Sequence, residues 1–121
     1  PKVSFRKDLI AEPVQKLCFI GDMGDGSETQ GKVALALKQE KCHHVFVVGD
    51  VIYSNGVETA DAPLFQERFL KFYEPVAQSG HKPQFSVVLG NHDYQGNEAA
   101  WLDISKKHPW IFFPHYYYLQ K

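Results

Sequence analysis

Residues 45–53, which read VFVVGDVIY, decide the fold class of this chain. Four apolar residues in a row, three of them valine, are typical of a strand that is buried within a sheet. Gly49 frees the backbone to turn at the end of that run, and the carboxylate of Asp50 follows at once. Two further segments repeat the pattern, at residues 17–22 (LCFIGD) and residues 85–93 (FSVVLGNHD). We therefore predict three buried strands, each followed by a glycine turn and an oxygen-bearing side chain.

Amphipathic segments separate these strands. Residues 29–41 and 65–73 carry apolar side chains at helical intervals, which predicts two helices, and Pro75 is expected to end the second. A third helix is predicted over residues 98–107, and the aromatic stretch of residues 110–119 is expected to contain a final strand. The apolar residues at helical intervals are Val33, Ala34 and Leu37 in the first helix and Leu64, Phe65, Phe69 and Phe72 in the second.

Strands that alternate with helices predict an α/β fold. The expected order is βαβαβα, with a mostly parallel sheet whose two faces are covered by helices. The chain has 121 residues, which is room for one hydrophobic core. Residues 1–16 alternate charge with isolated apolar positions and are interpreted as an N-terminal arm, and residues 17–121 as the folded part.

The composition excludes several classes of protein. A hydrophobic fraction of 44% and a charged fraction of 22% are those of a globular protein. The formal net charge of −1 argues against binding of nucleic acid or of an anionic membrane surface. No apolar run approaches the ~20 residues of a membrane-spanning helix. We interpret Cys18 and Cys42 as two small buried or half-buried thiols, in preference to a disulfide, so the cysteines do not decide the compartment.

The turns after the three strands point to one chemistry. Right-handed crossovers place the carboxyl ends of parallel strands at the same edge of the sheet. The oxygen-bearing or basic side chains expected to converge there are Asp22, Asp50, Asn91 and His92. Two carboxylates and an amide oxygen at one edge repel each other or stay unsatisfied unless cations lie between them. We predict a pair of metal ions, with Asp50, on the middle turn, bridging them.

Each turn also has a simpler interpretation when it is taken alone. An aspartate after a strand often caps the next helix or forms an Asx turn, and Tyr53 has the alternative role of a core aromatic residue. The glycine-rich residues 21–26 (GDMGDG) suggest a dinucleotide site, but their spacing differs from G-x-G-x-x-G and their aspartates would repel a pyrophosphate. Three such turns on successive strands, one of them with a tyrosine three residues on, favour the metal site.

The three turns together resemble the motifs of a known family. Residues 21–24 (GDMG), 49–53 (GDVIY) and 90–93 (GNHD) resemble those of the purple acid phosphatase branch of the calcineurin-like metallophosphoesterases. Residues 90–97 and the aromatic stretch around Pro114 are similar to the small tartrate-resistant acid phosphatases. The resemblance runs from the first predicted strand to the C-terminus. It implies the N-terminal half of a four-layer metallophosphoesterase sandwich, with the C-terminal half of the domain absent.

The resemblance implies a role for each matching residue. Asp22 and Tyr53 would bind Fe(III), since a phenolate is a hard anionic donor suited to that ion. Asp50 would bridge to a second, divalent ion (Fe, Zn or Mn), which Asn91 would also bind. Asn91 and His92 would face the substrate phosphate, and His92 would be the catalytic hydrogen-bond donor, or the acid for the leaving alcohol.

The chain departs from the family pattern in its histidines. The resemblance implies three later histidine ligands in V-x-x-H and G-H-x-H motifs, and none of the six histidines lies in either motif. His43, His44 and His81 are expected at the opposite end of the sheet, and His108 and His115 at the surface or in packing. We expect the chain to be truncated, to bind metal weakly by itself and to hydrolyse phosphate esters poorly or not at all.

Two acidic residues beside the motifs have other expected roles. Asp93 is expected to orient its own turn, either as a cap or through contacts behind the ligands. Asp25 lies next to Met23, where the family often has tryptophan, and it either alters the substrate preference or stays solvated, of which we favour the second.

The implied function is that of a phosphoric ester hydrolase dependent on two metal ions, with acid phosphomonoesterase as the expected activity on small phosphate esters or phosphoproteins. Two alternatives stay open: an inactive phosphatase fold kept for binding or scaffolding, and a phosphodiesterase or nucleotidase on the same metal centre. A secreted, periplasmic or lysosomal-like location is expected from the family. One sheet face would be bare, and the C-terminal half of the domain or another chain is expected to cover it.

Overall fold

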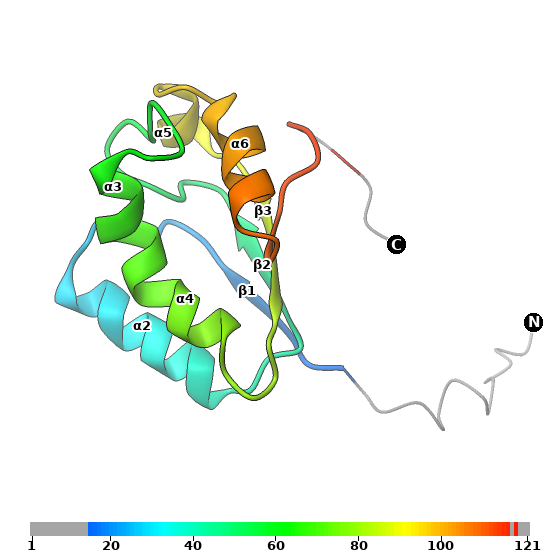
Figure 1. The fold of residues 1–121 in the computed structure, drawn as a ribbon. Coiled ribbons are helices and arrows are strands. Elements are labelled where there is room, and N and C mark those ends of the chain that lie inside the picture. The colour runs from blue at the N-terminus through cyan, green and yellow to red at the C-terminus, as the bar shows by residue number, and fades with distance from the viewer. Residues whose placement is uncertain (1–14, 117, 119–121) are drawn as a thin grey trace, which may run out of the picture.

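The computed structural model describes residues 15–116 and residue 118. In this part of the chain, four strands form one parallel sheet, in the order β1-β2-β3-β4 (Figure 1). The strands are β1 (Leu17–Ile20), β2 (His44–Val48), β3 (Gln84–Val88) and β4 (Ile111–Phe112). The predicted α/β fold with a mostly parallel sheet is confirmed, and β4 lies within the aromatic stretch where a final strand was expected. The predicted N-terminal arm falls almost wholly outside the described residues.

Helices connect each pair of neighbouring strands. The first, α2 (Glu28–Gln39), begins at Ser27, whose hydroxyl accepts a hydrogen bond from the backbone N–H of Gln30 at 3.2 Å. The helices of the later connections are α3 (Pro63–Phe65), η1 (Gln66–Leu70), α4 (Lys71–Ala77), α5 (Asn91–Tyr94) and α6 (Ala100–Lys107). None of the helices in the described part of the chain has the length and apolarity that crossing a lipid bilayer requires.

The prediction that Pro75 ends the second helix is wrong, since α4 continues through it to Ala77. Pro75 has no N–H to donate to the carbonyl of Lys71, so the helix loses one backbone hydrogen bond at this point. The residues around it are buried against the core, namely Tyr73, Val76 and Ala77. Their burial offsets the lost hydrogen bond and keeps the last turn helical.

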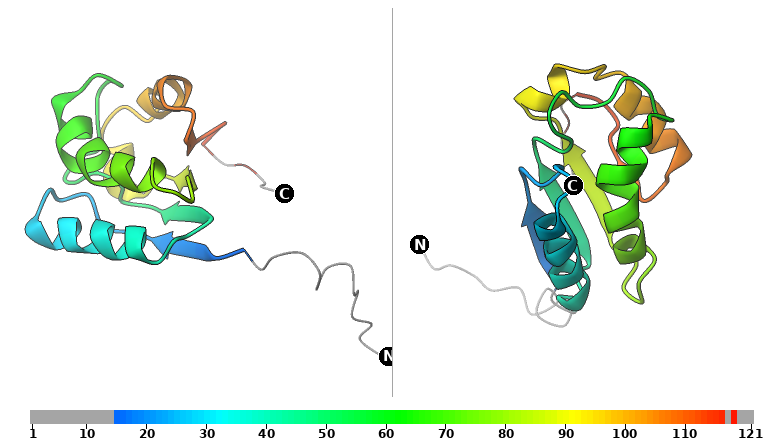
Figure 2. Two further views of the ribbon diagram at one scale, coloured as in Figure 1. Left: turned by 60° about the horizontal axis from the view of Figure 1, so that its bottom comes forward. Right: turned by 90° about the vertical axis from the view of Figure 1, so that its left-hand side faces the viewer.

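The helices of the described chain pack on one face of the sheet, as the two views of Figure 2 show together with Figure 1. The expectation of helices on both faces is therefore wrong for this part of the chain. Because the strand order follows the chain order, every right-handed crossover passes over the same face. On that face Val45 and Val47 are buried, whereas on the other Phe19 is 64% exposed and Val48 is 55% exposed. The expected bare apolar face is thus present.

Aromatic rings fill the space between the helices and the sheet. Trp101 of α6 packs edge-on against Phe65 and Phe69, with ring centroids 5.7 and 6.0 Å apart. Phe69 in turn contacts Phe85 of β3 at 6.3 Å. These rings join the second and third helical connections to the middle of the sheet. The turns that follow the strands are therefore supported by a packed aromatic core.

Cys18 and Cys42 form a disulfide, so the interpretation of two free thiols is wrong. Cys18 lies on β1, and Cys42 precedes β2 by two residues. Leu17 pairs with His44 in the parallel register, which brings the two cysteines to the same end of neighbouring strands, with Cα atoms 6.0 Å apart. That separation lies within the range that a disulfide spans.

Candidate metal centre

The three predicted turns meet at the carboxyl edge of the sheet. β1, β2 and β3 run parallel, so the turns that follow them lie side by side. The backbone N–H of Asp22 donates to the carbonyl of Gly49 at 3.1 Å, which joins the first turn to the second. Asp22 and Asp50 both have left-handed backbone conformations, with φ of 52° and 48°. Few non-glycine residues adopt such a φ, and aspartate tolerates it better than most because its side chain can hydrogen-bond locally.

Two glycines of the motifs are required by close packing between the turns. A Cβ atom at Gly24 would overlap the carbonyl of Val51, and one at Gly90 would overlap the backbone and carboxylate of Asp50. The backbone N–H of Tyr53 donates to the carbonyl of Gly24 at 2.8 Å. The first and second turns are therefore in direct backbone contact, which leaves no room for a side chain at position 24.

The side chains of Asp22, Asp50 and Tyr53 converge on one point. The Tyr53 hydroxyl donates to Asp22 Oδ1 at 3.1 Å and lies 3.4 Å from Asp50 Oδ2. Partial burial, followed by the hydrogen bond to Asp22 and the two nearby carboxylates, raises the pKa of Tyr53 to about 12. The two carboxylates therefore point to the same side of the molecule. Tyr53 contacts them through its polar end, which a core aromatic residue would not do.

His92 is held at the same place by two hydrogen bonds. Its backbone N–H donates to Asp50 Oδ1 at 3.0 Å, and its ring Nδ1 lies 2.6 Å from the carbonyl oxygen of Ser54. A carbonyl oxygen only accepts, so Nδ1 carries the proton and Nε2 is the free ring nitrogen. The ring also packs edge-on against Tyr53, with centroids 4.7 Å apart. Asn91, the first residue of α5, is exposed beside it.

Asp93 holds two of the turns through hydrogen bonds to their backbone N–H groups. Its carboxylate is buried and accepts backbone hydrogen bonds from Val51 at 2.9 Å, Ile52 at 3.0 Å and Gly90 at 2.9 Å. Burial raises the pKa of Asp93, and the nearby carboxylate of Asp50 raises it further. The three N–H donors lower the pKa, but their effect is smaller than that of burial. One buried side chain thus fixes both the turn after β2 and the turn after β3, in agreement with its predicted orienting role.

Asp25 lies apart from these groups. It is exposed, and its Oδ1 accepts a hydrogen bond from the backbone N–H of Ser27 at 2.9 Å. The hydrogen bond from the Ser27 hydroxyl, followed by that from the Ser27 backbone N–H, lowers the pKa of Asp25. Asp25 therefore shapes the approach to α2 and stays solvated, as predicted.

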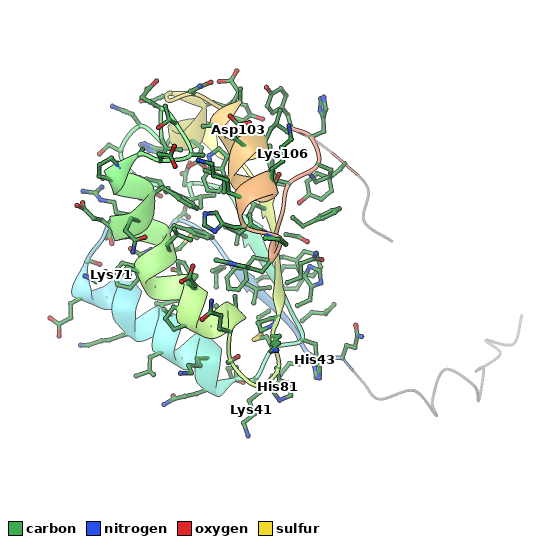
Figure 3. All side chains as sticks on the ribbon, in the orientation of Figure 1. Lys41, His43, Lys71, His81, Asp103 and Lys106 are labelled. Carbon is green, nitrogen blue, oxygen red and sulfur yellow. A yellow bond between two sulfur atoms is a disulfide. The ribbon has the colours of Figure 1, made fainter. Side chains whose placement is uncertain are left out.

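Four of the other histidines, His43, His44, His81 and His108, lie away from the three turns. His43 and His81 are in ring contact at 5.0 Å, at the end of the molecule opposite α5 (Figures 1 and 3). His44 begins β2 at that same end, and His108 packs against Phe65. Within residues 15–116 and 118, no group of three or more His, Cys, Asp and Glu side chains is placed to hold a metal ion. Any ion at the carboxyl edge would depend on the Tyr53 phenol as well.

The donor set fits a hard cation. A six-coordinate ion with oxygen ligands at about 2.1 Å holds neighbouring oxygens about 3 Å apart. The separations of 3.1 and 3.4 Å around the Tyr53 hydroxyl are close to that value. Two carboxylates and a phenol are donors of the kind that ferric and other hard ions prefer. A cation would also relieve the repulsion between Asp22 and Asp50, which the phenol proton alone now bridges.

The parallel sheet and the side chains at its carboxyl edge define a class of protein. Residues 15–120 match the family of calcineurin-like phosphoesterases, and the chain belongs to that family. Purple acid phosphatase 3 of Arabidopsis thaliana is 46% identical to the chain over 88 residues, which are 69% of the chain and 23% of that protein. Purple acid phosphatase 4 of the same plant is 43% identical over 88 residues, covering 69% of the chain and 25% of that protein.

A mammalian relative matches along more of the chain. Tartrate-resistant acid phosphatase type 5 of Oryctolagus cuniculus is 26% identical over 118 residues, or 89% of the chain and 36% of that protein. The resemblance to the purple acid phosphatases is confirmed by these relatives. The chain spans about a quarter of the length of the plant relatives and about a third of the rabbit protein.

Proposed function

We propose that this chain contributes the carboxyl-edge part of a phosphoric ester hydrolase that depends on two metal ions and acts on phosphate monoesters at acidic pH. The observation that carries the proposal is the convergence of Asp22, Asp50 and Tyr53 around one hydroxyl oxygen. Membership of the phosphoesterase family supports hydrolysis of phosphate esters, and the names of the relatives support acid phosphatase activity.

The proposed ligands follow from the donor geometry and from the motifs. Asp22 and Tyr53 would hold a ferric ion, Asp50 would be shared with a divalent ion, and Asn91 would help to hold that second ion. When bound, the two ions supply Lewis-acid polarisation of the phosphate oxygens and activation of water. Tyr53 would have to lose its hydroxyl proton to serve as an anionic ligand. The backbone N–H of His92 holds one oxygen of Asp50 and leaves the other directed at Tyr53.

His92 is the proposed proton donor to the departing alcohol. Its Nδ1 proton is committed to the carbonyl of Ser54, so only Nε2 is free to meet a substrate. Neutral His92 offers a lone pair at Nε2, whereas protonated His92 offers an N–H there. Proton donation to the alcohol therefore requires the imidazolium form, in which Nε2 also carries a proton.

Because the chain by itself is expected to hydrolyse phosphate esters poorly or not at all, the test uses the chain joined to the proposed C-terminal half of the domain. Hydrolysis of p-nitrophenyl phosphate by that protein is measured at mildly acidic pH with iron and zinc bound. Asp50→Asn and Tyr53→Phe should each lower kcat/KM about 100-fold or more, because each removes a charged ligand worth several kcal/mol. Asp25→Asn is the matched control, since it removes an exposed carboxylate of the first turn that lies apart from the ligands and keeps an oxygen that can accept from Ser27. Equal activity of Asp50→Asn and Asp25→Asn would contradict the proposal.

We also propose partners and a location. The substrates are small phosphate esters or phosphoproteins, and the chain takes no nucleic acid and no membrane. The C-terminal half of the domain, or another chain, covers the bare sheet face; the exposure of Phe19 and Val48 supports this cover. A secreted, periplasmic or lysosomal-like location is supported by the Cys18–Cys42 disulfide, because disulfides persist in oxidising compartments.

A further inference from the structure

Arg68 occupies a place that the motifs do not explain. It lies in η1, the π-helical segment between α3 and α4, and is half-buried. Its guanidinium donates a hydrogen bond to the backbone carbonyl of Tyr53. Single π-helical turns are uncommon and occur often at functional sites. Here the segment directs a long cationic side chain at the very residue proposed to supply the phenolate.

The stem of Arg68 also packs on the first turn. Gly26 has a φ of +76°, and a Cβ atom there would come within 3.3 Å of Arg68 Cγ and Nε. The arginine therefore passes over Gly26 before it reaches Tyr53. A side chain at position 26 would push the arginine away. Glycine at this position therefore allows both the positive φ of the turn and the passage of the Arg68 side chain over it.

A buried glutamine ties the backbone of Arg68 to the same turn. Gln30 of α2 is only 2% exposed. Its Oε1 accepts from the N–H of Gly26 at 2.8 Å, and its Nε2 donates to the carbonyl of Arg68 at 2.8 Å and to the Tyr73 hydroxyl at 3.3 Å. All of these partners are satisfied within the protein, so the link between α2 and η1 is specific in its geometry.

We infer that Arg68 is a positioning residue, which holds the Tyr53 turn against the turn that carries Asp22 so that their oxygens meet at one ion. This inference rests on the proposed function, because it concerns the same metal ligands. Arg68 does not touch the oxygens themselves and acts through the backbone of Tyr53. The contact suits arginine better than lysine, since the planar guanidinium presents several donors at a fixed angle while its stem lies on Gly26.

Ferric binding, measured by the visible absorption of the iron–phenolate pair, tests the inference without reference to activity. The full chain is titrated with ferric citrate, and the parent, Arg68→Met and Lys71→Met are compared. Arg68→Met keeps an unbranched stem and loses the donors, and we expect its ferric affinity to fall about 10- to 100-fold, as for other groups that orient ligands. Its absorption band should also shift, because the phenolate approaches the ion differently.

Lys71→Met is the matched control. It removes a positive charge three residues further along the chain, from an exposed side chain whose Nζ lies 5.4 Å from the centroid of the Phe72 ring (labelled in Figure 3). Its ferric affinity and band should equal those of the parent. Parent-like affinity and band in Arg68→Met would overturn the inference, and so would an equal loss in Lys71→Met.

Tyr53→Phe separates this inference from the proposed function. If the parent shows no band that Tyr53→Phe abolishes, the proposed function itself fails. If that band is present and Arg68→Met leaves it unchanged, only the positioning role fails. Thermal unfolding of each variant reports its folding. Should Arg68→Met not fold, Arg68→Lys decides: we expect an affinity between those of the parent and Tyr53→Phe, and an affinity equal to the parent's overturns the inference.

Discussion

Replacement of Asp93 is the most direct test of how the two turns are held together. Its carboxylate is fully buried and receives the backbone N–H groups of Val51, Ile52 and Gly90. Val51 and Ile52 are buried as well, so water cannot replace the lost acceptor. Asp93→Ala leaves three donors without partners, and Asp93→Asn leaves one, since the amide oxygen can keep Val51 and Ile52 while the NH₂ group faces Gly90.

The magnitudes follow from the number of stranded donors. A buried donor without a partner costs about 1–3 kcal/mol. Asp93→Asn should therefore lower the free energy of unfolding by about 1–3 kcal/mol, and Asp93→Ala by about 3–9 kcal/mol. A domain of this size has about 5–15 kcal/mol in total, so the alanine variant approaches the limit of folding. The asparagine variant is the more informative of the two.

Urea unfolding followed by far-ultraviolet circular dichroism measures these changes. Asp103→Asn on the exposed side of α6, labelled in Figure 3, makes the same chemical change at the surface and should shift the free energy by less than about 1 kcal/mol. The reasoning is refuted if Asp93→Asn unfolds at the same urea concentration as Asp103→Asn.

A pH series adds a second reading of Asp93. Burial raises the pKa of Asp93 in the folded chain above the ordinary value of 3.8. Between pH 3.8 and that raised pKa, the folded chain keeps a proton that the unfolded chain has lost. The contribution of this group to stability must then fall as pH rises from 3.8 through the raised pKa. Asp93→Asn should remove that part of the pH dependence, and an unchanged profile would contradict the assignment.

Three further predictions concern the rest of the fold. Replacing Cys18 and Cys42 together by alanine should lower the free energy of unfolding by about 3 kcal/mol, because the bridge closes a loop of sequence separation 24; reductant should reproduce the loss in the parent, and a parent-like urea midpoint would argue against the disulfide. Gly24→Ala forces a Cβ onto the carbonyl of Val51 and should cost about 1–3 kcal/mol in the same assay, whereas an unchanged midpoint would mean that the turns are not in contact. Phe19→Ser should reduce the binding of a hydrophobic fluorescent dye and change the stability by less than about 1 kcal/mol, since the ring is 64% exposed; undiminished dye fluorescence would show that this face is not the one that binds the dye.

The strands and the turns could be predicted because their signals are local. Four apolar residues before a glycine leave little choice of structure, and the predicted first strand, Leu17–Ile20, coincides with β1. The convergence of Asp22 and Asp50 needed only the handedness of the crossovers. The role of Asp93 was also accessible, since a carboxylate three residues after a glycine turn commonly accepts backbone N–H groups.

Other features depend on tertiary packing, which the pattern does not encode. The pairing of Cys18 with Cys42 requires the register of β1 against β2, and a separation of 24 residues gives no sign of it. Arg68 and Gln30 lie among ordinary helical residues, so neither their contact with the Tyr53 turn nor their tie to the Gly26 turn is visible in the sequence. The continuation of α4 past Pro75 depends in the same way on what is buried around it.

The agreement between strand order and chain order has a consequence for synthesis. In the described sheet each new strand adds to the edge made by its predecessor, so β2 needs only β1 and β3 needs only β2. A chain that leaves the ribosome from its N-terminus can therefore build this sheet progressively, without waiting for a distant partner strand. The first two strands can pair before β3 joins them, whereas the turn after β2 is completed only when Asp93, beyond β3, accepts its backbone N–H groups.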